Sequence, residues 1–472
     1  MAIAPAKPTA PQLDAGEPLS LCGGFGVFVG ERPQRTGMHF VSWKIKQEAQ
    51  VARTEVMGSK LGQGGWSLLT LPFMVALAIL GAAAGARAQT PAAPSPPTVE
   101  IYGFGMADAI ADFKQNNPDW YDTVRPSRLP NVANQFGQDG HFYLSARQSR
   151  LGTRATLPTS TGDVKAQFEF DMFGVGPDAG LTTIRLRHAW GQYKQIGGGQ
   201  TNTQFMDIDV FPNTIEYWGP NGMMFVRNPQ VFWQPIAKAD GTNLTVAIEA
   251  PGASGDAGTF ADRVELQNVR GRYPLPDLTG HYRYARSWGY VQVGGVLRKI
   301  AWDDLIPNDQ FDLNGSTWGG GVTVSSNLKA TPADTLRWQF TYGQGIANYF
   351  NDAPIDVGLK SNGNNPVTPV TGEALGIFGM VVALDHTWND KWTTAGFYSR
   401  VDVSNSDLQA PNAYKSGQYA AANLLCTPAK NVMMGGELQW ANRKNHSDGF
   451  TSNDVRLQFS FKYSFSAKVI GG

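Results

Sequence analysis

The chain has 472 residues, enough for several soluble domains or one large barrel, with 54 glycines, 29 prolines and 11% aromatic residues. Charged residues make up only 17% of the chain, below the roughly 25% usual in soluble domains. The formal net charge of zero lacks the basic excess of a nucleic-acid binder, so we expect no nucleic acid partner. Two cysteines are too few for a disulfide framework or a zinc cluster.

The first predicted element is a secretory signal peptide at residues 57–88. It has a basic start at Lys60, an apolar core over residues 68–80, and the small-x-small triplet 86–88, with cleavage expected after the triplet. A transmembrane anchor is the alternative, because the apolar stretch with its small-residue tail approaches spanning length. The Pro/Ala-rich linker at residues 89–98 directly follows the triplet and favours the signal peptide.

Residues 1–56 precede this export signal, and we predict that they are an N-terminal extension outside the mature protein. Cleavage would remove eight basic and five acidic residues, which leaves 39 − 8 = 31 basic and 39 − 5 = 34 acidic residues in the mature chain. The mature chain is therefore mildly acidic. It would keep Cys426 as its single cysteine.

Beyond the linker, apolar and polar residues alternate along the chain. Such runs occur at residues 164–171, 244–248, 291–297, 322–324, 336–343, 432–440 and 455–465. In the last run, the side chains from Val455 to Phe465 at every second position are apolar, and the residues between them are Arg, Gln, Ser, Lys and Ser. A period of two predicts β-strands and an all-β fold.

A soluble β-sandwich would alternate in the same way. The strand length of about ten residues, the export signal, and the aromatic pair Trp388 and Trp392 around the turn Asn389-Asp390 favour a transmembrane antiparallel β-barrel. Closure into a barrel is also the β architecture that pairs every backbone N–H and C=O group within lipid.

Two kinds of connection separate the strands. Short segments at 158–162, 388–392 and 427–431 are typical of periplasmic turns, and the Gly/Asn/Pro-rich segments 351–372 and 404–417 are typical of external loops.

The 384 residues after the cleavage site, divided by roughly 24 residues for a strand and its connection, predict about 16 strands, a size that encloses an aqueous channel. We place the barrel at residues 99–465 and a C-terminal tail at 466–472.

Several stretches are similar to outer-membrane porins. VEIYG at 99–103 resembles a porin first strand, and QSRLG at 148–152, followed by a Gly-Asp turn, resembles the second and third. TIRLRHAW at 183–190 and FMDIDVFPNTIEYWGP at 205–220 resemble the DcaP-type porin family. The resemblance implies a homotrimeric porin in the lipid of the bacterial outer membrane. It also implies passive diffusion of small hydrophilic solutes, with dicarboxylates and related anions favoured.

Arginines on the polar strand faces are the candidate pore-lining residues. If the apolar faces contact lipid, the inward-pointing arginines are Arg150, Arg154, Arg185, Arg187 and Arg337. Rings of Lys or Arg favour anions in a pore, so we predict a basic ladder. The alternative is ordinary lumen lining in which these arginines pair with Glu169 and Asp171.

Residues 207–227 are too polar and too rich in Pro and Gly for a plain strand. They can fold into the bore, where Asp207 and Asp209 would lie at a constriction; two solvated carboxylates on a strand face are the alternative. The pair lacks the glycine and distal glutamate of a calcium loop, and we predict no metal site.

Signatures of enzymes are weak, and we predict neither catalytic residues nor a cofactor. Ser326 and Lys329 have β-lactamase spacing without its companion motifs. His446-Ser447-Asp448-Gly449 resembles the pattern of outer-membrane phospholipases, but a serine adjacent to the histidine on a strand points to the opposite face. A polar hairpin tip explains this segment. A phospholipase-like barrel enzyme and a plugged structural or adhesive barrel remain the alternatives to a porin.

Overall fold

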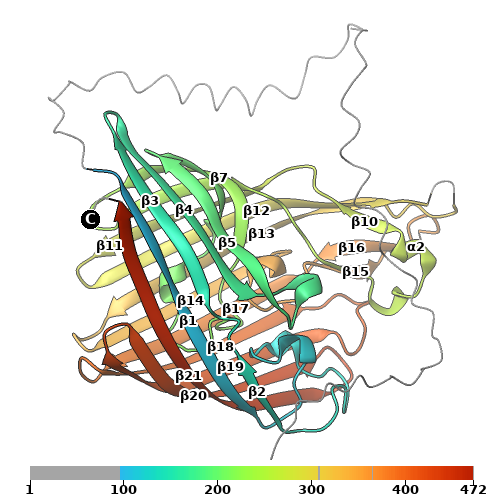
Figure 1. Ribbon diagram of the computed structural model, residues 1–472. Coiled ribbons are helices and arrows are strands. Elements are labelled where there is room, and N and C mark those ends of the chain that lie inside the picture. Colours follow the sequence, from blue (N-terminus) through green and yellow to red (C-terminus); the bar gives the residue numbers. More distant parts are fainter. Residues whose placement is uncertain (1–95, 307–308, 364, 471–472) are drawn as a thin grey trace, which may run out of the picture. The chain divides into compact units, whose positions relative to one another are not determined.

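A ring of antiparallel strands makes up most of the described chain (Figure 1). The computed structural model describes residues 96–306, 309–363 and 365–470. The predicted extension, the signal peptide and all but the end of the linker lie outside these residues. Within the described ranges, no helix is long and apolar enough to cross a membrane.

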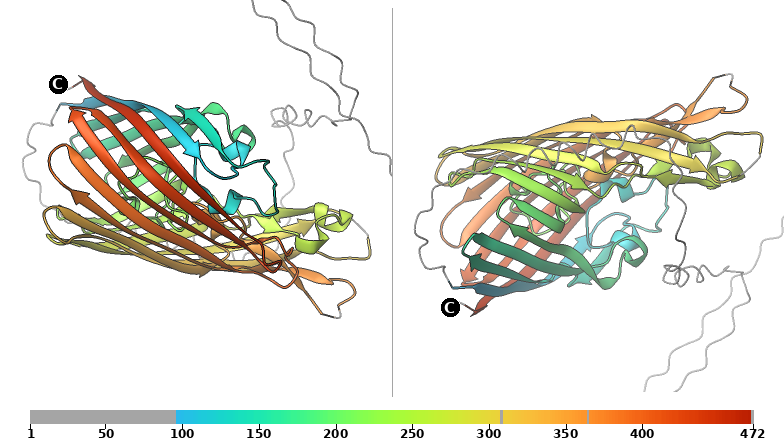
Figure 2. Two further views of the ribbon diagram at one scale, coloured as in Figure 1. Left: turned by 90° about the horizontal axis from the view of Figure 1, so that it is seen from below. Right: turned by 90° about the horizontal axis from the view of Figure 1, so that it is seen from above.

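Sixteen strands of the described chain form the ring, and each pairs antiparallel with its neighbours. β1 pairs with β21 along fourteen residue pairs, which closes the ring, and Figure 2 shows these first and last strands side by side. The predicted barrel of about 16 strands is confirmed. The ring strands are β1 (Thr98–Asp112), β3 (Arg150–Thr159), β4 (Gly162–Phe173), β5 (Thr182–Tyr193), β6 (Ile196–Asn202), β7 (Arg227–Ala237), β8 (Asn243–Glu249), β11 (Asp277–Arg286), β12 (Gly289–Asp304), β13 (Gly315–Lys329), β14 (Asp334–Gln344), β17 (Gly376–Thr387), β18 (Trp392–Ser404), β19 (Tyr414–Ala429), β20 (Val432–Asn445) and β21 (Thr451–Ile470).

Smaller elements continue beyond the ends of some ring strands, on the side of the ring where the long connections lie. β2 (His141–Ser145) pairs with β1 beyond β3, and β10 (Val269–Arg272) pairs with β12 beyond β11. A separate three-stranded sheet contains β9 (Gly255–Asp256), β15 (Val357–Ser361) and β16 (Val370–Ala374). The described helices are single turns: η1 (Pro118–Trp120), η2 (Pro126–Arg128), η3 (Gly176–Asp178), η4 (Ile208–Val210), η5 (Gly258–Phe260), α2 (Val264–Gln267) and η6 (Ala347–Tyr349).

The apolar face of the ring points outward. On β21, Leu457, Phe459 and Phe461 are 48%, 50% and 45% exposed, whereas Gln458 and Ser460 between them are 0% exposed. A soluble protein would bury the apolar residues and expose the polar ones. The reversed pattern is that of a barrel with a lipid-facing exterior and a polar interior.

β21 continues beyond the predicted end of the barrel at Phe465. It runs to Ile470, and Lys468 pairs with Glu100 on β1. Because β1 begins at Thr98, its first residues present backbone N–H and C=O groups that need partners, and the extended β21 supplies them. Residues 466–470 therefore belong to the closing seam of the barrel and are not a separate tail.

The connections alternate in length, as the sequence indicated. The segments predicted as short turns join β3 to β4, β17 to β18 and β19 to β20, and they all lie at one end of the antiparallel ring. The long segment 351–372 lies at the other end, within the β14–β17 connection. The predicted loop 404–417 is shorter than expected: residues 405–413 connect β18 to β19, whereas Ser404 ends β18 and residues 414–417 begin β19. We call these two ends the turn end and the loop end.

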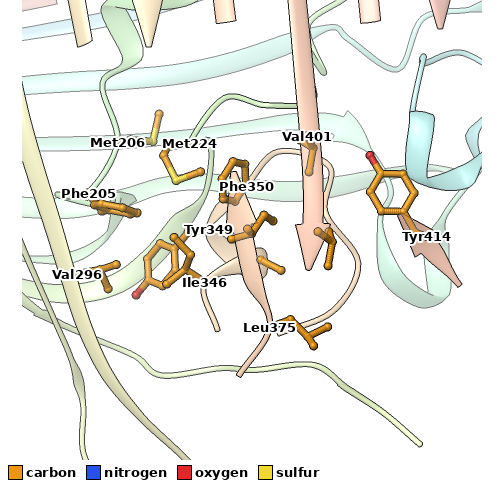
Figure 3. Close-up of a cluster of buried hydrophobic side chains, with 13 residues drawn as sticks. Phe205, Met206, Met224, Val296, Ile346, Tyr349, Phe350, Leu375, Val401 and Tyr414 are labelled. Atoms are coloured by element: carbon orange, nitrogen blue, oxygen red, sulfur yellow. The ribbon is translucent and has the colours of Figure 1, made fainter. Parts of the chain in front are cut away.

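Two segments fold into the ring. Residues 203–226, here called the inner loop, connect β6 to β7, and residues 345–356 follow β14. Both contribute to one buried apolar cluster inside the barrel. Its labelled members in Figure 3 are Phe205, Met206, Met224, Val296, Ile346, Tyr349, Phe350, Leu375, Val401 and Tyr414. The lumen is thus partly filled by packed side chains.

Replacing Phe459 by arginine tests the outward orientation of the apolar face. We expect the variant to lose about 2–4 kcal/mol of unfolding free energy in bilayers, because a charge near the bilayer midplane must leave water. Chemical unfolding in liposomes measures the loss. The matched variant Phe465→Arg, nearer the strand end, should lose less, and an equal loss in the two variants would contradict a lipid-facing strand.

Candidate functional site

The inner loop lies against the polar face of the wall strands. The backbone N–H of Gly222 donates to Ser399 Oγ on β18 at 2.8 Å, and that of Met224 donates to Gln339 Oε1 on β14 at 2.8 Å. The loop also contacts Gln148, whose Oε1 atom accepts a hydrogen bond from the backbone N–H of Tyr217 at 2.6 Å. Non-strand backbone at membrane depth requires such partners, and the inward side chains of the wall supply them.

Asp207 and Asp209 lie together near the beginning of the inner loop. The Asp207 side chain is fully buried and accepts a hydrogen bond from Arg283 Nη2 on β11 at 2.7 Å, while Arg283 Nη1 contacts Asp209. Residues 207–226 do fold into the bore. The two carboxylates do not sit on a strand face, since η4 occupies this position, and one guanidinium holds both of them.

Most of the predicted arginines gather around two carboxylates on β4. Arg187 pairs with both Glu169 and Asp171, at 2.7 and 2.8 Å, and Arg185 pairs with Asp171 at 2.7 Å. Arg150 lies 3.5 Å from Glu169. The geometry therefore brings three predicted arginines into one paired group, here called the arginine cluster.

The other two predicted arginines lie outside this paired group. Arg154 stacks on Tyr102, with 4.0 Å between its guanidinium carbon and the ring centre, and the Tyr102 hydroxyl donates to Glu169. Arg154 thus lies beside the cluster, on its turn-end side, and is not one of its members. Arg337 is separate on β14, where it pairs with Asp385 at 2.7 Å.

The cluster contains two further arginines, Arg227 and Arg125, and neither was predicted from the sequence. Arg227 begins β7, directly after the inner loop, and lies within electrostatic reach of Arg150, Arg185 and Arg187 and of the carboxylate of Asp171. Its Nε atom is buried, and within the described residues it makes no hydrogen bond. Arg227 also forms no ion pair among those residues, which distinguishes it from the three predicted arginines.

Arg125 is the second missed residue, in the long β1–β2 connection. Its guanidinium lies 4.0 Å from the ring of Trp120 and 4.7 Å from that of Trp218, and it pairs with Asp352 at 2.8 Å. Trp218 belongs to the inner loop and also lies 5.7 Å from Arg185. No strand periodicity marks Arg125, because it lies in an irregular segment.

Comparison with known proteins identifies the chain. The sequence profile of the DcaP outer membrane protein family matches residues 85–465. This chain belongs to that family. It is a porin-type β-barrel of the bacterial outer membrane. Proteins with curated descriptions give no match.

Solved structures resemble the chain in fold. The outer membrane channel DcaP of Acinetobacter baumannii is 22% identical, with a TM-score of 0.63, over 81% of this chain and 100% of that chain. An anion-selective porin from Comamonas acidovorans is 11% identical, with a TM-score of 0.49, over 78% of this chain and 100% of that chain.

The enzyme-like motifs lie in structural positions of this DcaP-family barrel. Ser326 Oγ donates to the backbone carbonyl of Tyr290, and Lys329 is three residues further along the same strand. His446-Ser447-Asp448-Gly449 forms the tip between β20 and β21, where Asp448 accepts from Asn445. Across the described ranges, no group of His, Cys, Asp and Glu is arranged to hold a metal ion.

Glu216 is the most deeply buried carboxyl of the inner loop. It is 0% exposed and accepts hydrogen bonds from the Trp218 N–H at 2.7 Å and from Tyr419 Oη at 3.1 Å. Burial, with a smaller contribution from nearby Glu437, raises the pKa of Glu216 to about 8. The docked loop therefore favours the neutral carboxyl.

We expect the docked inner loop to lose stability as the pH rises. Glu216 has its ordinary pKa, 4.5, when the loop is in water. The contribution of Glu216 to the docked state is therefore fully present below pH 4.5 and is lost as the pH rises to about 8, an amount on the order of 5 kcal/mol.

Urea unfolding from pH 5 to 9 measures this dependence. Glu216→Gln should flatten the profile, whereas Glu373→Gln, at a half-buried position in β16 outside the inner loop, should leave it unchanged. Identical slopes in the wild type and Glu216→Gln would contradict the assignment to Glu216.

Proposed function

We propose that the barrel is a water-filled channel for the passive diffusion of small hydrophilic solutes, and that it favours small anions such as dicarboxylates. The charge of the arginine cluster carries this proposal. Its positive members are Arg125, Arg150, Arg185, Arg187 and Arg227, and the carboxylates among them are Glu169, Asp171 and Asp352. Five positive charges against three negative ones leave two positive charges on one side of the lumen.

Solvent access supports a role in conduction. The side chains of Arg150 and Arg185 are 21% and 23% exposed, so their guanidinium groups keep contact with water although each is paired. A lining of uncompensated cations lowers the electrostatic barrier for anions and raises it for cations. Arg227, which has no carboxylate partner within the described chain, contributes to the uncompensated charge.

The assembly and processing of the channel are part of the proposal. By resemblance to its family, the barrel forms a homotrimer. The sequence pattern makes residues 57–88 a cleaved signal peptide and leaves residues 1–56 outside the mature protein. The apolar cluster inside the lumen (Figure 3) is the observation that favours the alternative, a plugged barrel. Conductance separates the two, because a plugged barrel would be silent.

Replacing Arg227 by glutamate tests the anion preference. The change takes the net charge of the cluster from +2 to 0, and we expect the anion-to-cation permeability ratio to fall severalfold. Reversal potentials of the mature protein in planar bilayers with a salt gradient measure this ratio. Arg227 is a better target than Arg185 or Arg187, whose removal would leave Asp171 short of partners.

A control and a stronger variant complete the test. Arg263→Glu makes the same charge change in an external segment, where the side chain is 63% exposed, and should leave the ratio unchanged. Arg185→Glu combined with Arg187→Glu should reverse the selectivity. An unchanged reversal potential in Arg227→Glu and in this double variant would reject the role of the cluster while leaving the channel in place.

A further inference from the structure

We propose that Arg283 is a positioning residue of the channel: it holds the first part of the inner loop against β11–β13 and thereby sets the bore between two lumen cavities. This inference rests on the proposed channel function. It concerns residues 207–209, which contact β11–β13 and not the strands β3–β5 of the arginine cluster.

Asp207 ties the inner loop to three adjacent strands. Besides the bond from Arg283 on β11, its Oδ2 atom accepts from Tyr290 Oη on β12 and from Ser325 Oγ on β13, each at 2.7 Å. The side chain is 0% exposed. A fully buried carboxylate is stable only with such a complete set of donors, so the position of the loop backbone here is closely determined.

Arg283 is itself fixed by the wall. Its Nε atom donates to Gln292 Oε1 at 2.9 Å, and its guanidinium carbon lies 4.0 Å from the centre of the Tyr290 ring. The two remaining nitrogens contact Asp207 and Asp209 on the loop. One planar guanidinium therefore joins the wall to two side chains of the same single-turn helix η4, a geometry that a lysine could not supply.

The held segment separates two cavities along the barrel. A cavity of 300 Å³ is lined by Gln234, Thr245 and His281 in the middle of the barrel. A second cavity, of 560 Å³, is lined by Asp240 and Gly289 next to the turns. Ile208 and Arg283 line both cavities, so they form the partition between the middle of the lumen and its turn end.

Release of this partition would be local. Phe205 and Met206, directly before the held segment, belong to the buried apolar cluster, and so does Met224 near the other end of the loop. Loss of the Arg283 contacts would therefore loosen residues 207–209, while Val210 stays buried with Met223 and Val381 and the roots of the loop stay packed. The narrow section between the two cavities would widen.

Two variants test this role, each with a check that the barrel folds. Asp207→Asn keeps an oxygen acceptor for Tyr290 and Ser325 and removes only the charge pair, whereas Arg283→Gln removes the bridge from the other side. We expect either change to raise the single-channel conductance about twofold, because conductance follows the cross-section of the narrowest part. Larger uncharged sugars should then enter proteoliposomes faster.

Arg286→Gln is the matched control. Arg286 lies on the same strand and lines the 560 Å³ cavity, but its ion-pair partner is Asp240 at the turn end. The control loses the same charge without touching the inner loop, and its conductance should match that of the wild type. An equal rise in the control would overturn the proposal, since it would show an effect of charge alone.

A reversible crosslink distinguishes movement of the loop from other causes. Asn327 Nδ2 donates to the backbone carbonyl of Asp209 at 3.2 Å, so cysteines at these two positions can lock the loop to β13. Cys426 is replaced by alanine in this background. With Arg283→Gln present, oxidation should return the conductance to the wild-type value, and reduction should raise it again.

The outcomes separate this inference from the channel function. A conducting wild type with unaltered conductance in Asp207→Asn and Arg283→Gln overturns the role of Arg283 alone, as does an oxidised form that conducts like the reduced one. A silent wild type overturns the channel function and this inference with it. Supporting results are raised conductance in both variants, a normal control and reversal on crosslinking.

Discussion

Pairing of backbone groups in lipid is the constraint on which the rest of this structure depends. Each N–H or C=O left unpaired in hydrocarbon costs several kcal/mol, and the ring meets this requirement by joining β1 to β21. Closure then sorts the side chains, because every second residue of each strand must point inward. Polar residues from strands far apart in the sequence are thereby collected in one compartment.

The same constraint governs the inner loop. Its backbone lies inside the ring without strand partners, and wall side chains such as Ser399 and Gln339 take their place. A large part of the polar wall therefore forms hydrogen bonds with the backbone of the inner loop. The arginines around Glu169 and Asp171 are instead paired with carboxylates of the neighbouring strand, so the two parts of the wall differ in chemistry.

Properties that depend on neighbouring residues could be predicted from the sequence. Alternation identifies β21 and β14, length gives the number of strands, and the Pro- and Gly-rich composition of residues 207–227 marks a departure from strand structure. Contacts between distant residues could not be predicted. Arg283 lies 76 positions from Asp207, and nothing near either residue indicates the other.

The boundary of the last strand shows the same limit. Residues 466–470 carry no alternation of large apolar side chains, so the sequence alone placed the barrel end at Phe465. Their structure depends on β1, whose first residues require partners. Arg227 was missed for a related reason, because its importance arises from the arginines of β3 and β5 and not from its own surroundings in the chain.

The apolar cluster inside the barrel has a consequence for biogenesis. Phe205 and Met224 of the inner loop pack with Ile346 and Phe350 from a segment more than a hundred residues later, and contacts of such separation form late in folding. A ring that closed before these segments docked would be a wider opening than the finished protein. The two inner segments must therefore dock while the strands insert into the membrane, if the outer membrane is to remain a barrier as new barrels are added to it.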